Sequence, residues 1–286
     1  MICPVCESKD PRLVLEKESL VLARCAVCGV VFLNDLQNIF DSSRYDYYKD
    51  RVNQAQNEIY NPITTKRYAA LLKRLEDFRK SSMLLDVGCG EGQFLNTAKS
   101  LGWLAKGLDL SPYAVEICKK FGADASCIDF LGPGLESKDY DIVTMFEVLE
   151  HLTRPKEYLL KTNAILRKGG VLVITTPNFD SITRMLLSNK WSVINAEHLF
   201  YFTSASIKRL ITGCGFRIID FKVKNITLPE YSKLFSRNSG EAYKENQQLR
   251  ELAESNRFLS FLKTGINHAL NITRLGETIE CICQKI

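Results

Sequence analysis

A short glycine-rich stretch contains residue types that could bind a cofactor. Asp86 ends an apolar run, and Gly88, Gly90 and Gly92 follow it at alternate positions. Glycine takes positive φ readily and lets the backbone come close to a ligand. Asp86 and Glu91 place negative charge beside this turn, which argues against a phosphate ligand. A dinucleotide site would in addition space its glycines G-x-G-x-x-G.

A second acidic residue, Asp109, ends the next apolar segment. It follows the glycines by roughly 20 residues, the distance at which an acidic side chain meets ribose hydroxyls in nucleoside-binding βαβ units. With Leu-Asp-Val ahead of G-x-G-x-G, the stretch resembles the S-adenosylmethionine site of class I methyltransferases, whose cofactor is cationic. The resemblance implies cofactor contacts from Asp86, the three glycines, Asp109 and Leu110. The alternative is a tight turn that binds no ligand.

The resemblance extends to two further pairs of residues. In these methyltransferases an acidic residue after the third strand accepts from the adenine amino group, and the next residue packs against the ring. This implies such roles for Asp129 and Phe130. Phe146 and Glu147, at the end of the fourth expected strand, complete the expected cofactor-binding set.

The string Phe-Glu-Val-Leu-Glu-His-Leu at 146–152 resembles the segment that flanks the methyl acceptor in methyltransferases of the ubiquinone O-methyltransferase type. Glu147 and His151 are therefore candidates for a general base. Together with Glu150 they could instead bind a second metal ion. In a third interpretation, Glu150 and His151 only begin the next helix.

The loop 191–203 carries the preferred base. Its segment 196–203 resembles the loop that brings a histidine toward the acceptor in the same group, which implies this role for His198. An imidazole with a pKa near neutrality can take a proton from a hydroxyl or ammonium group. Glu197 could orient it. The competing interpretation is a histidine packed among aromatic residues in the core.

Four cysteines have the spacing of a metal site. Cys3 and Cys6 form one C-x-x-C pair, Cys25 and Cys28 a second, and eighteen residues separate the pairs. This spacing predicts a structural zinc site, in which four thiolates leave no coordination position open for chemistry. Two disulfides or free thiols are the alternatives, and they suit a cytosolic chain poorly. The other six cysteines are expected to be packed side chains without a site role.

Strands and helices alternate through the middle of the chain, which predicts a parallel sheet. The expected fold is α/β, a Rossmann-like seven-stranded methyltransferase sheet, and the resemblance implies that its last strand is antiparallel. The expected strands are 83–87, 104–109, 124–128, 140–146, 171–176, 216–223 and 278–283. The expected domains are a zinc ribbon (1–40), a helical connector or lid (41–80), the cofactor-binding core (81–223), a helical insertion (224–276) and the final core strand (277–286).

Two segments outside the core have open roles. The tyrosines of 45–48 are expected to pack between ribbon and core, or to form a lid over the substrate. The insertion at 224–276 could cap the acceptor site, form a dimer face or lie on a membrane surface.

Composition limits the possible partners. The 286 residues are 45% apolar and 25% charged, and the net charge of +5 is spread along the chain, so neither nucleic acid nor anionic lipid is demanded. No targeting sequence or membrane span is apparent, so a cytoplasmic location is expected. The oligomeric state stays open. Methyltransferases that act on exocyclic nucleobase amines resemble one another in an Asn- or Asp-Pro-Pro-aromatic string at the end of the fourth strand. The segment 146–149 does not resemble that string, which disfavours base methylation of this type.

We therefore expect an S-adenosylmethionine-dependent methyltransferase that acts on a small molecule. Resemblance to ribbon-bearing bacterial methyltransferases implies a sugar, or a natural-product hydroxyl or amine, as acceptor. One alternative is an rRNA or tRNA methyltransferase that binds RNA through the ribbon, which predicts a continuous basic face. The other is a nucleotide-binding scaffold without catalysis.

Overall fold

A computed structural model describes residues 1–34, 42–133, 135, 139–225 and 257–286. The chain forms two units. The first consists of Met1–Leu36, Thr176–Arg209 and Phe221–Glu280, and the second of Gln37–Thr175, Leu210–Asp220 and Cys281–Ile286. Of the expected insertion, residues 226–256 lie outside the described part, and Arg257–Thr273 form helix α10. The five expected domain boundaries stay a prediction.

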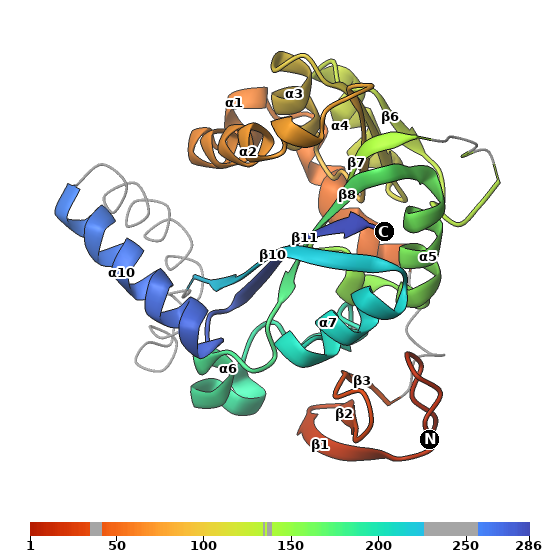
Figure 1. The fold of residues 1–286 in the computed structure, drawn as a ribbon, viewed down its shortest axis with the longest axis vertical. Coiled ribbons are helices and arrows are strands. Elements are labelled where there is room, and N and C mark those ends of the chain that lie inside the picture. Colours follow the sequence, from red (N-terminus) through yellow and green to blue (C-terminus); the bar gives the residue numbers. More distant parts are fainter. Residues whose placement is uncertain (35–41, 134, 136–138, 226–256) are drawn as a thin grey trace. The chain divides into compact units, whose positions relative to one another are not determined.

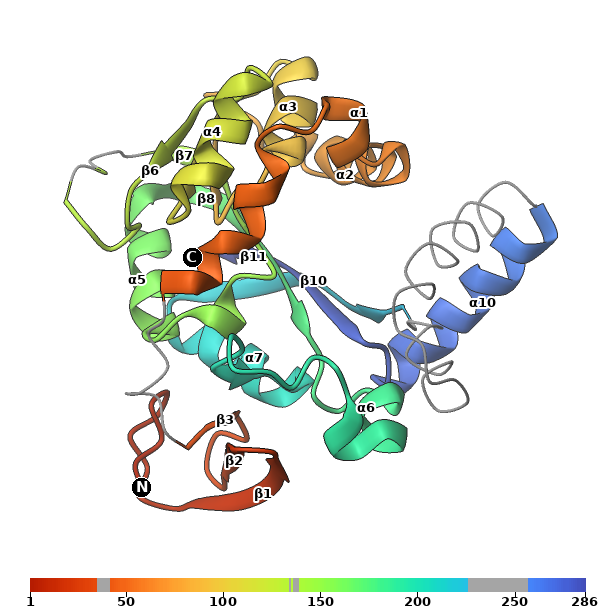
Figure 2. The ribbon, with the colours of Figure 1, turned by 180° about the vertical axis from the view of Figure 1, so that it is seen from behind.

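The second unit begins with helices and continues with alternating strands and helices (Figure 1). Its elements are η1 (Ser42–Arg51), α1 (Gln56–Ile59), α2 (Pro62–Arg74), η2 (Glu76–Phe78), β4 (Met83–Val87), α3 (Gln93–Ser100), β5 (Leu104–Asp109), α4 (Pro112–Lys120), β6 (Ala125–Cys127), β7 (Tyr140–Phe146), η3 (Leu149–His151) and α5 (Pro155–Ile165). Helices α3 and α4 lie beside β5 and β6 in both views, and η1 lies beside α4 (Figures 1 and 2).

Local sequence accounts for these elements. In β4 every residue after Met83 is buried, and Leu84 joins apolar residues of α2 and α3 in one hydrophobic cluster. Helix α4 starts at Pro112, because the Ser111 hydroxyl accepts from the Ala114 N–H at 3.2 Å and Pro112 suits the first helical position.

Seven strands form one sheet with the order β10-β11-β8-β7-β4-β5-β6, which confirms the expected fold. The three strands on the β10 side of β7 are β8 (Leu166–Pro177), β10 (Phe216–Lys224) and β11 (Thr278–Lys285). Strands β4, β5, β6, β7 and β8 pair in parallel.

The last strand runs antiparallel to β10, as the resemblance implied. The Ile286 N–H donates to the Gly215 carbonyl at one end, and the Glu277 N–H donates to the Asn225 carbonyl at the other. The two strands therefore run in opposite directions.

Strand β8 corrects one boundary. The sequence predicted a strand at 171–176, but β8 already begins at Leu166, directly after α5 ends at Ile165. The Arg167 guanidinium donates to the buried Asp141 carboxylate and to the Phe78 carbonyl. These tertiary contacts favour the extended backbone over one more helical turn.

The first unit contains the N-terminal strands β1 (Pro11–Lys17), β2 (Leu20–Cys25) and β3 (Val31–Leu33), which form an antiparallel sheet with β9 (Phe200–Tyr201). Strand β2 lies between β1 and β3 in this sheet. Helices α6 (Ile182–Leu187) and α7 (Ser204–Gly213) and the turn η4 (Ser188–Lys190) flank β9 in the chain. Among the described residues, no helix is both long and apolar enough to cross a membrane.

Candidate cofactor site

The glycine turn connects β4 to α3 in the second unit. All three glycines have positive φ, and Gly92 is the N-cap of α3. The N–H groups of Gly88 and Cys89 both donate to the Leu108 carbonyl, at 2.7 and 3.0 Å, which ties the turn to β5. A Cβ at Gly88 would clash with Val148 Cγ2. Glycine is thus required here for backbone conformation and for space.

Asp86 lies at the carboxyl end of β4 with a side chain only 2% exposed. The Thr144 hydroxyl on β7 donates to its Oδ1 at 2.6 Å. Burial raises the pKa of Asp86 to about 7, the Thr144 hydrogen bond opposes the rise, and the negative charge of Asp109 adds to it. A nearby cation would lower this pKa again and keep the carboxylate ionised. The site therefore fits a ligand with a positive charge.

Asp109 occupies the corresponding end of β5. Its Oδ2 accepts from the Gly90 N–H at 2.9 Å and its Oδ1 accepts from the Ser111 N–H at 2.8 Å. Burial raises the pKa of this carboxyl, and backbone hydrogen bonds from Ser111, Gly90 and Leu110 oppose the rise. The next side chain, Leu110, is 42% exposed. The structure thus brings Asp86, the glycines and Asp109 together at one edge of the sheet, where open α/β sheets bind ligands.

Asp129 and Phe130 follow β6 and contact α5. The Asp129 Oδ1 accepts from the Tyr158 hydroxyl and from the Leu131 N–H, both at 3.0 Å. Phe130 is 2% exposed and packs against the Tyr158 ring with centroids 5.3 Å apart. Asp129 is exposed at the surface of its loop, whereas Phe130 is a core residue there. Their expected roles toward adenine stay predictions.

Phe146 and Glu147 end β7, beside an aromatic cluster. The Phe146 ring contacts the rings of Phe94 and Tyr68, at centroid distances of 4.9 and 5.6 Å. Burial raises the pKa of Tyr68 above its usual range, and the charges of Asp86 and Glu147 add to the rise. Tyr68, on α2, therefore lies near two expected site carboxylates.

Glu147 has the unusual φ of 53° for a residue with a side chain. Its N–H donates to the Thr175 carbonyl at 3.0 Å, which holds this conformation. Desolvation raises the pKa of its carboxyl, while hydrogen bonds with Thr175 and Glu150 lower it. His151 ends the following turn η3 and lies at intermediate exposure. A carboxyl with a raised pKa is suited to accept a proton near neutral pH.

Residues of the expected connector (41–80) also contact the glycine turn, and these contacts were not predicted from the sequence. The Arg51 guanidinium on η1 forms an ion pair with Glu91, with Nη2 to Oε2 at 3.1 Å. The Tyr60 hydroxyl donates to the Glu91 carbonyl at 3.0 Å. The negative charge of Glu91, expected to face the ligand, is therefore paired with Arg51.

Tyr48 lies beside the same turn. A Cβ at Gly90 would stand 3.2 Å from the Tyr48 hydroxyl. Burial raises the pKa of Tyr48 above its usual range, and the charges of Asp109 and Glu91 contribute. Tyr48 therefore covers part of the glycine turn, a position that neither expected interpretation, packing between ribbon and core or a lid over the substrate, describes. Tyr45 lies outside the residues whose side chains are described.

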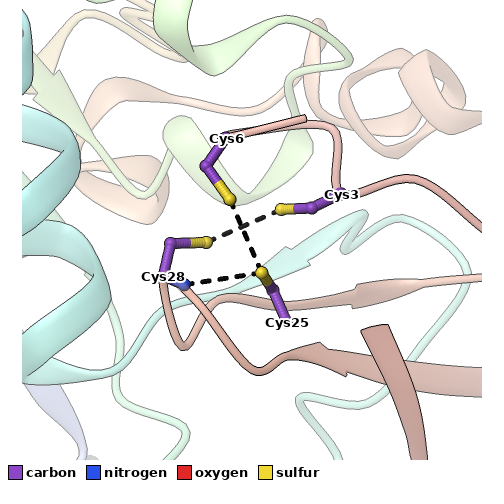
Figure 3. A group of neighbouring side chains, drawn as sticks. All are labelled: Cys3, Cys6, Cys25 and Cys28. Atoms are coloured by element: carbon purple, nitrogen blue, oxygen red, sulfur yellow. Dashed lines mark hydrogen bonds between the residues drawn. The ribbon is translucent and has the colours of Figure 1, made fainter. Parts of the chain in front are cut away.

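The four N-terminal cysteines converge in the first unit (Figure 3). The Sγ atoms of Cys3 and Cys28 are 3.6 Å apart, and those of Cys6 and Cys25 are 3.5 Å apart. Sulfurs at the corners of a tetrahedron around zinc are about 3.8 Å apart, given Zn–S bonds of about 2.3 Å. Disulfide sulfurs are only about 2.05 Å apart. The donor set and spacing therefore fit a four-thiolate metal site.

His198 belongs to the first unit, whereas Glu147 and His151 belong to the second. The His198 N–H donates to the Asn195 side-chain oxygen at 3.1 Å, as does the Glu197 N–H at 2.8 Å. The His198 ring lies 6.1 Å from the Tyr201 ring, between centroids. These contacts fix the backbone that carries His198.

Comparisons with known proteins show which family this chain resembles. A profile described as "Methyltransferase domain" matches residues 60–220, more than half of the chain. The mitochondrial ubiquinone biosynthesis O-methyltransferase of Schizosaccharomyces pombe is 30% identical over 124 residues, which cover 41% of this chain and 43% of that protein. The ubiquinone biosynthesis O-methyltransferase of Coxiella burnetii is 26% identical over 127 residues, covering 42% of this chain and 52% of that protein. The matched stretch thus spans about half the length of these relatives.

Solved structures share the fold. A SAM-dependent methyltransferase from Archaeoglobus fulgidus has a TM-score of 0.53 and 20% identity, covering 84% of this chain and 99% of that chain. The plantazolicin methyltransferase BpumL, solved with SAH, has a TM-score of 0.55 and 17% identity, and the match covers 87% of this chain and 93% of that chain. With the profile match over residues 60–220, the strand order of the sheet and the glycine turn after β4, the chain belongs to the class I S-adenosylmethionine-dependent methyltransferases.

Proposed function

We propose that this protein transfers the methyl group of S-adenosylmethionine to a small-molecule acceptor. The observation that carries the proposal is the buried Asp86 carboxyl beside the glycine turn, with its pKa raised to about 7. Such a carboxyl gains most from a cationic partner. S-adenosylmethionine offers an ammonium group, whereas the pyrophosphate of a dinucleotide would add repulsion.

The cofactor contacts are divided among three carboxylates. Asp86 pairs with the ammonium group, Asp109 accepts from ribose hydroxyls, and Asp129 accepts from the adenine amino group. Gly88 and Gly90 allow the backbone to approach the ligand. When bound, the cofactor supplies an electrophilic methyl group on a sulfonium. The protein contributes mainly by holding the acceptor in line with that methyl group.

A base removes the acceptor proton as the methyl group arrives. His198 is the preferred base, and Glu147 or His151 are the other candidates. The raised pKa of Glu147 supports a proton-accepting role for this carboxyl. Glu147, Glu150 and His151 could alternatively bind a second metal ion that orients the acceptor oxygen, because carboxylate and imidazole ligands suit divalent metals.

The acceptor atom is most simply a hydroxyl oxygen. Two relatives are named as ubiquinone biosynthesis O-methyltransferases, which supports oxygen over nitrogen. A sugar or a natural-product hydroxyl remains our proposed acceptor class. These names offer no support for RNA as the acceptor.

The cysteine cluster binds one structural zinc ion. Four thiolates within 4.8 Å of one another support this assignment, and their number leaves no position for catalysis. Elemental analysis of protein purified without chelators should find one zinc per chain. A chain that is fully folded and free of metal would contradict the assignment.

The test of the function is a transfer assay with S-adenosylmethionine labelled in its methyl group by deuterium. The purified protein is incubated with panels of phenols, sugars, nucleotide sugars, amines and RNA oligonucleotides, and products are detected by mass spectrometry. We expect one labelled methyl group on a hydroxyl-bearing small molecule. His198→Gln should lose activity by about two orders of magnitude or more. Glu116→Gln, an exposed change on α4, should not. Labelled RNA, or cofactor binding without any product, would overturn the proposal.

A further inference from the structure

The N-terminal ribbon and the loop that carries His198 share one sheet within the first unit. Strand β3 pairs antiparallel with β9, with Val31 opposite Tyr201 and Phe32 opposite Phe200. The Leu33 N–H continues the ladder to the Leu199 carbonyl at 3.0 Å. The ribbon is thus joined through backbone hydrogen bonds to the residue that follows His198.

Lys17 makes a second connection from the opposite edge of the ribbon. It ends β1, and its Nζ donates to the carbonyls of Trp191 and Ile194, at 3.1 and 2.6 Å. Both of these loop residues are 1% exposed. One ammonium group therefore binds two carbonyl groups of the loop, neither of which lies in a helix or strand.

A third contact starts at the metal-binding end. The Arg209 guanidinium on α7 donates to the Val27 carbonyl at 2.6 Å, and Val27 lies between Cys25 and Cys28. The cysteine cluster, the ribbon strands and both ends of the loop are thus linked by described contacts inside one unit.

The loop has little regular structure of its own. Within 191–203 the only strand is β9, which has two residues. Asn195 supports the backbone, because its side-chain oxygen accepts from two N–H groups and its carbonyl accepts from the Tyr201 hydroxyl at 3.2 Å. At the far end of the loop, Phe202 bridges to Asn178, and its carbonyl accepts from the Phe179 N–H at 2.8 Å. A strand this short is not stable without a neighbour. The order of Phe200 and Tyr201 therefore depends on β3, their partner strand.

Strand β3 in turn depends on the cysteine cluster. It has three residues and begins three positions after Cys28. A ribbon of about 35 residues is too small to fold on its own hydrophobic core, and small metal-bound domains of this kind unfold when the metal is removed.

We propose that the ribbon is a zinc-dependent scaffold for residues 191–203, with Lys17 as a positioning residue, so that metal occupancy sets the order of the loop carrying His198. The inference rests on the proposed function only for the catalytic importance of His198. The ordering of the loop is independent of that role.

Hydrogen exchange of the full chain, read by mass spectrometry, tests this directly. In the zinc-loaded wild type, peptides within 191–203 should be protected. Lys17→Met keeps the aliphatic length but removes the ammonium group, and it should speed exchange in these peptides by about tenfold or more. Lys9→Met is the matched control, because Lys9 is an exposed ribbon lysine, and it should leave exchange unchanged.

Zinc removal is the second arm. A chelator should speed exchange in 191–203 along with the ribbon, whereas peptides within 83–109 stay protected and S-adenosylhomocysteine affinity stays within about twofold. Unchanged exchange in 191–203 after verified zinc loss would overturn the inference, as would unchanged exchange in Lys17→Met.

The transfer assay separates the inference from the proposed function. If Lys17→Met speeds exchange in the loop and lowers kcat while S-adenosylhomocysteine affinity is unchanged, the scaffold inference and the catalytic role of His198 are both supported. If the loop loosens and methyl transfer continues at the wild-type rate, the scaffold inference stands and the role of His198 is wrong.

Discussion

Asp86 on β4 and Thr144 on β7 are register partners in the sheet, and the Thr144 hydroxyl donates to the Asp86 carboxyl at 2.6 Å. This contact holds a buried acidic group at the edge of the sheet next to the glycine turn. Ionising this buried carboxyl without a ligand costs free energy, which lowers the stability of the ligand-free protein. The ionised carboxylate is in return available to bind a cationic cofactor.

Asp86→Asn should separate stability from binding. The folded-state pKa of about 7 lies above the ordinary value of 3.8, so Asp86 supports folding while protonated at low pH. That contribution is lost as the pH rises through about 7. In the ligand-free protein at pH 8, the asparagine variant should therefore be more stable, by on the order of 2 kcal/mol. Thermal unfolding at pH 5 and pH 8 measures this.

The same substitution should abolish the pH dependence of cofactor binding. In the wild type, S-adenosylmethionine affinity should fall by up to about tenfold per pH unit below pH 7, because binding requires ionised Asp86. Asp86→Asn should bind weakly at every pH. Equal affinity of the wild type at pH 5.5 and pH 8 would contradict the ammonium-binding role of Asp86.

Gly88→Ala should destroy the cofactor turn. Alanine at φ 72° is strained, by about 1–2 kcal/mol, and its Cβ would also clash with Val148. Gly122→Ala is the matched control, since Gly122 has φ 81° but no atom within 4 Å of the added Cβ. We expect lost S-adenosylhomocysteine binding in the first variant alone. Equal binding by the two variants in calorimetry would show that the Val148 contact does not constrain the turn.

Arg51 should support cofactor affinity through Glu91. Arg51→Met leaves a partly buried carboxylate without its ion pair, so the connector should loosen and S-adenosylhomocysteine should bind roughly tenfold more weakly. Lys66→Met, an exposed change on α2, is the control. Adding Glu91→Gln to Arg51→Met should restore part of the affinity, because both charges are then gone. A double variant as weak as the sum of the two single changes would argue against coupling.

Tyr158→Phe should affect recognition of the adenine amino group. The Tyr158 hydroxyl holds the Asp129 carboxylate at 3.0 Å. Its loss should weaken S-adenosylhomocysteine binding by about three- to tenfold. S-inosylhomocysteine lacks the amino group, so its affinity should not change. Equal weakening of both ligands would indicate general damage to the site and exclude a specific effect on Asp129.

The parts of the fold that depend on short stretches of sequence were predictable. The expected strands 104–109 and 140–146 match β5 and β7. The Ser111 cap and Pro112 place the start of α4. In each case the signal comes from apolar or capping residues within about ten positions. The convergence of Cys3, Cys6, Cys25 and Cys28 was likewise predicted from two short C-x-x-C pairs.

Contacts between distant segments were not predictable. Arg51 and Glu91 are 40 residues apart, and Tyr158 and Asp129 are 29 apart. The sequence pattern around a tyrosine on an amphipathic helix is the same whether its side chain packs in the core or hydrogen-bonds to a site carboxylate. Strand β9 was expected to be loop, because two residues carry no alternation and only β3, far away in the chain, makes them a strand.

Calorimetric titration with S-adenosylhomocysteine, and in parallel with NAD, tests the cofactor assignment most directly. The zinc-loaded wild type and Asp109→Ala are compared under identical conditions. We predict that S-adenosylhomocysteine alone binds to the wild type and that Asp109→Ala loses this binding, because the variant removes the acceptor of the ribose hydroxyls and of the Gly90 N–H. Binding of NAD in place of S-adenosylhomocysteine, or of neither ligand, would contradict the assignment of this site to S-adenosylmethionine.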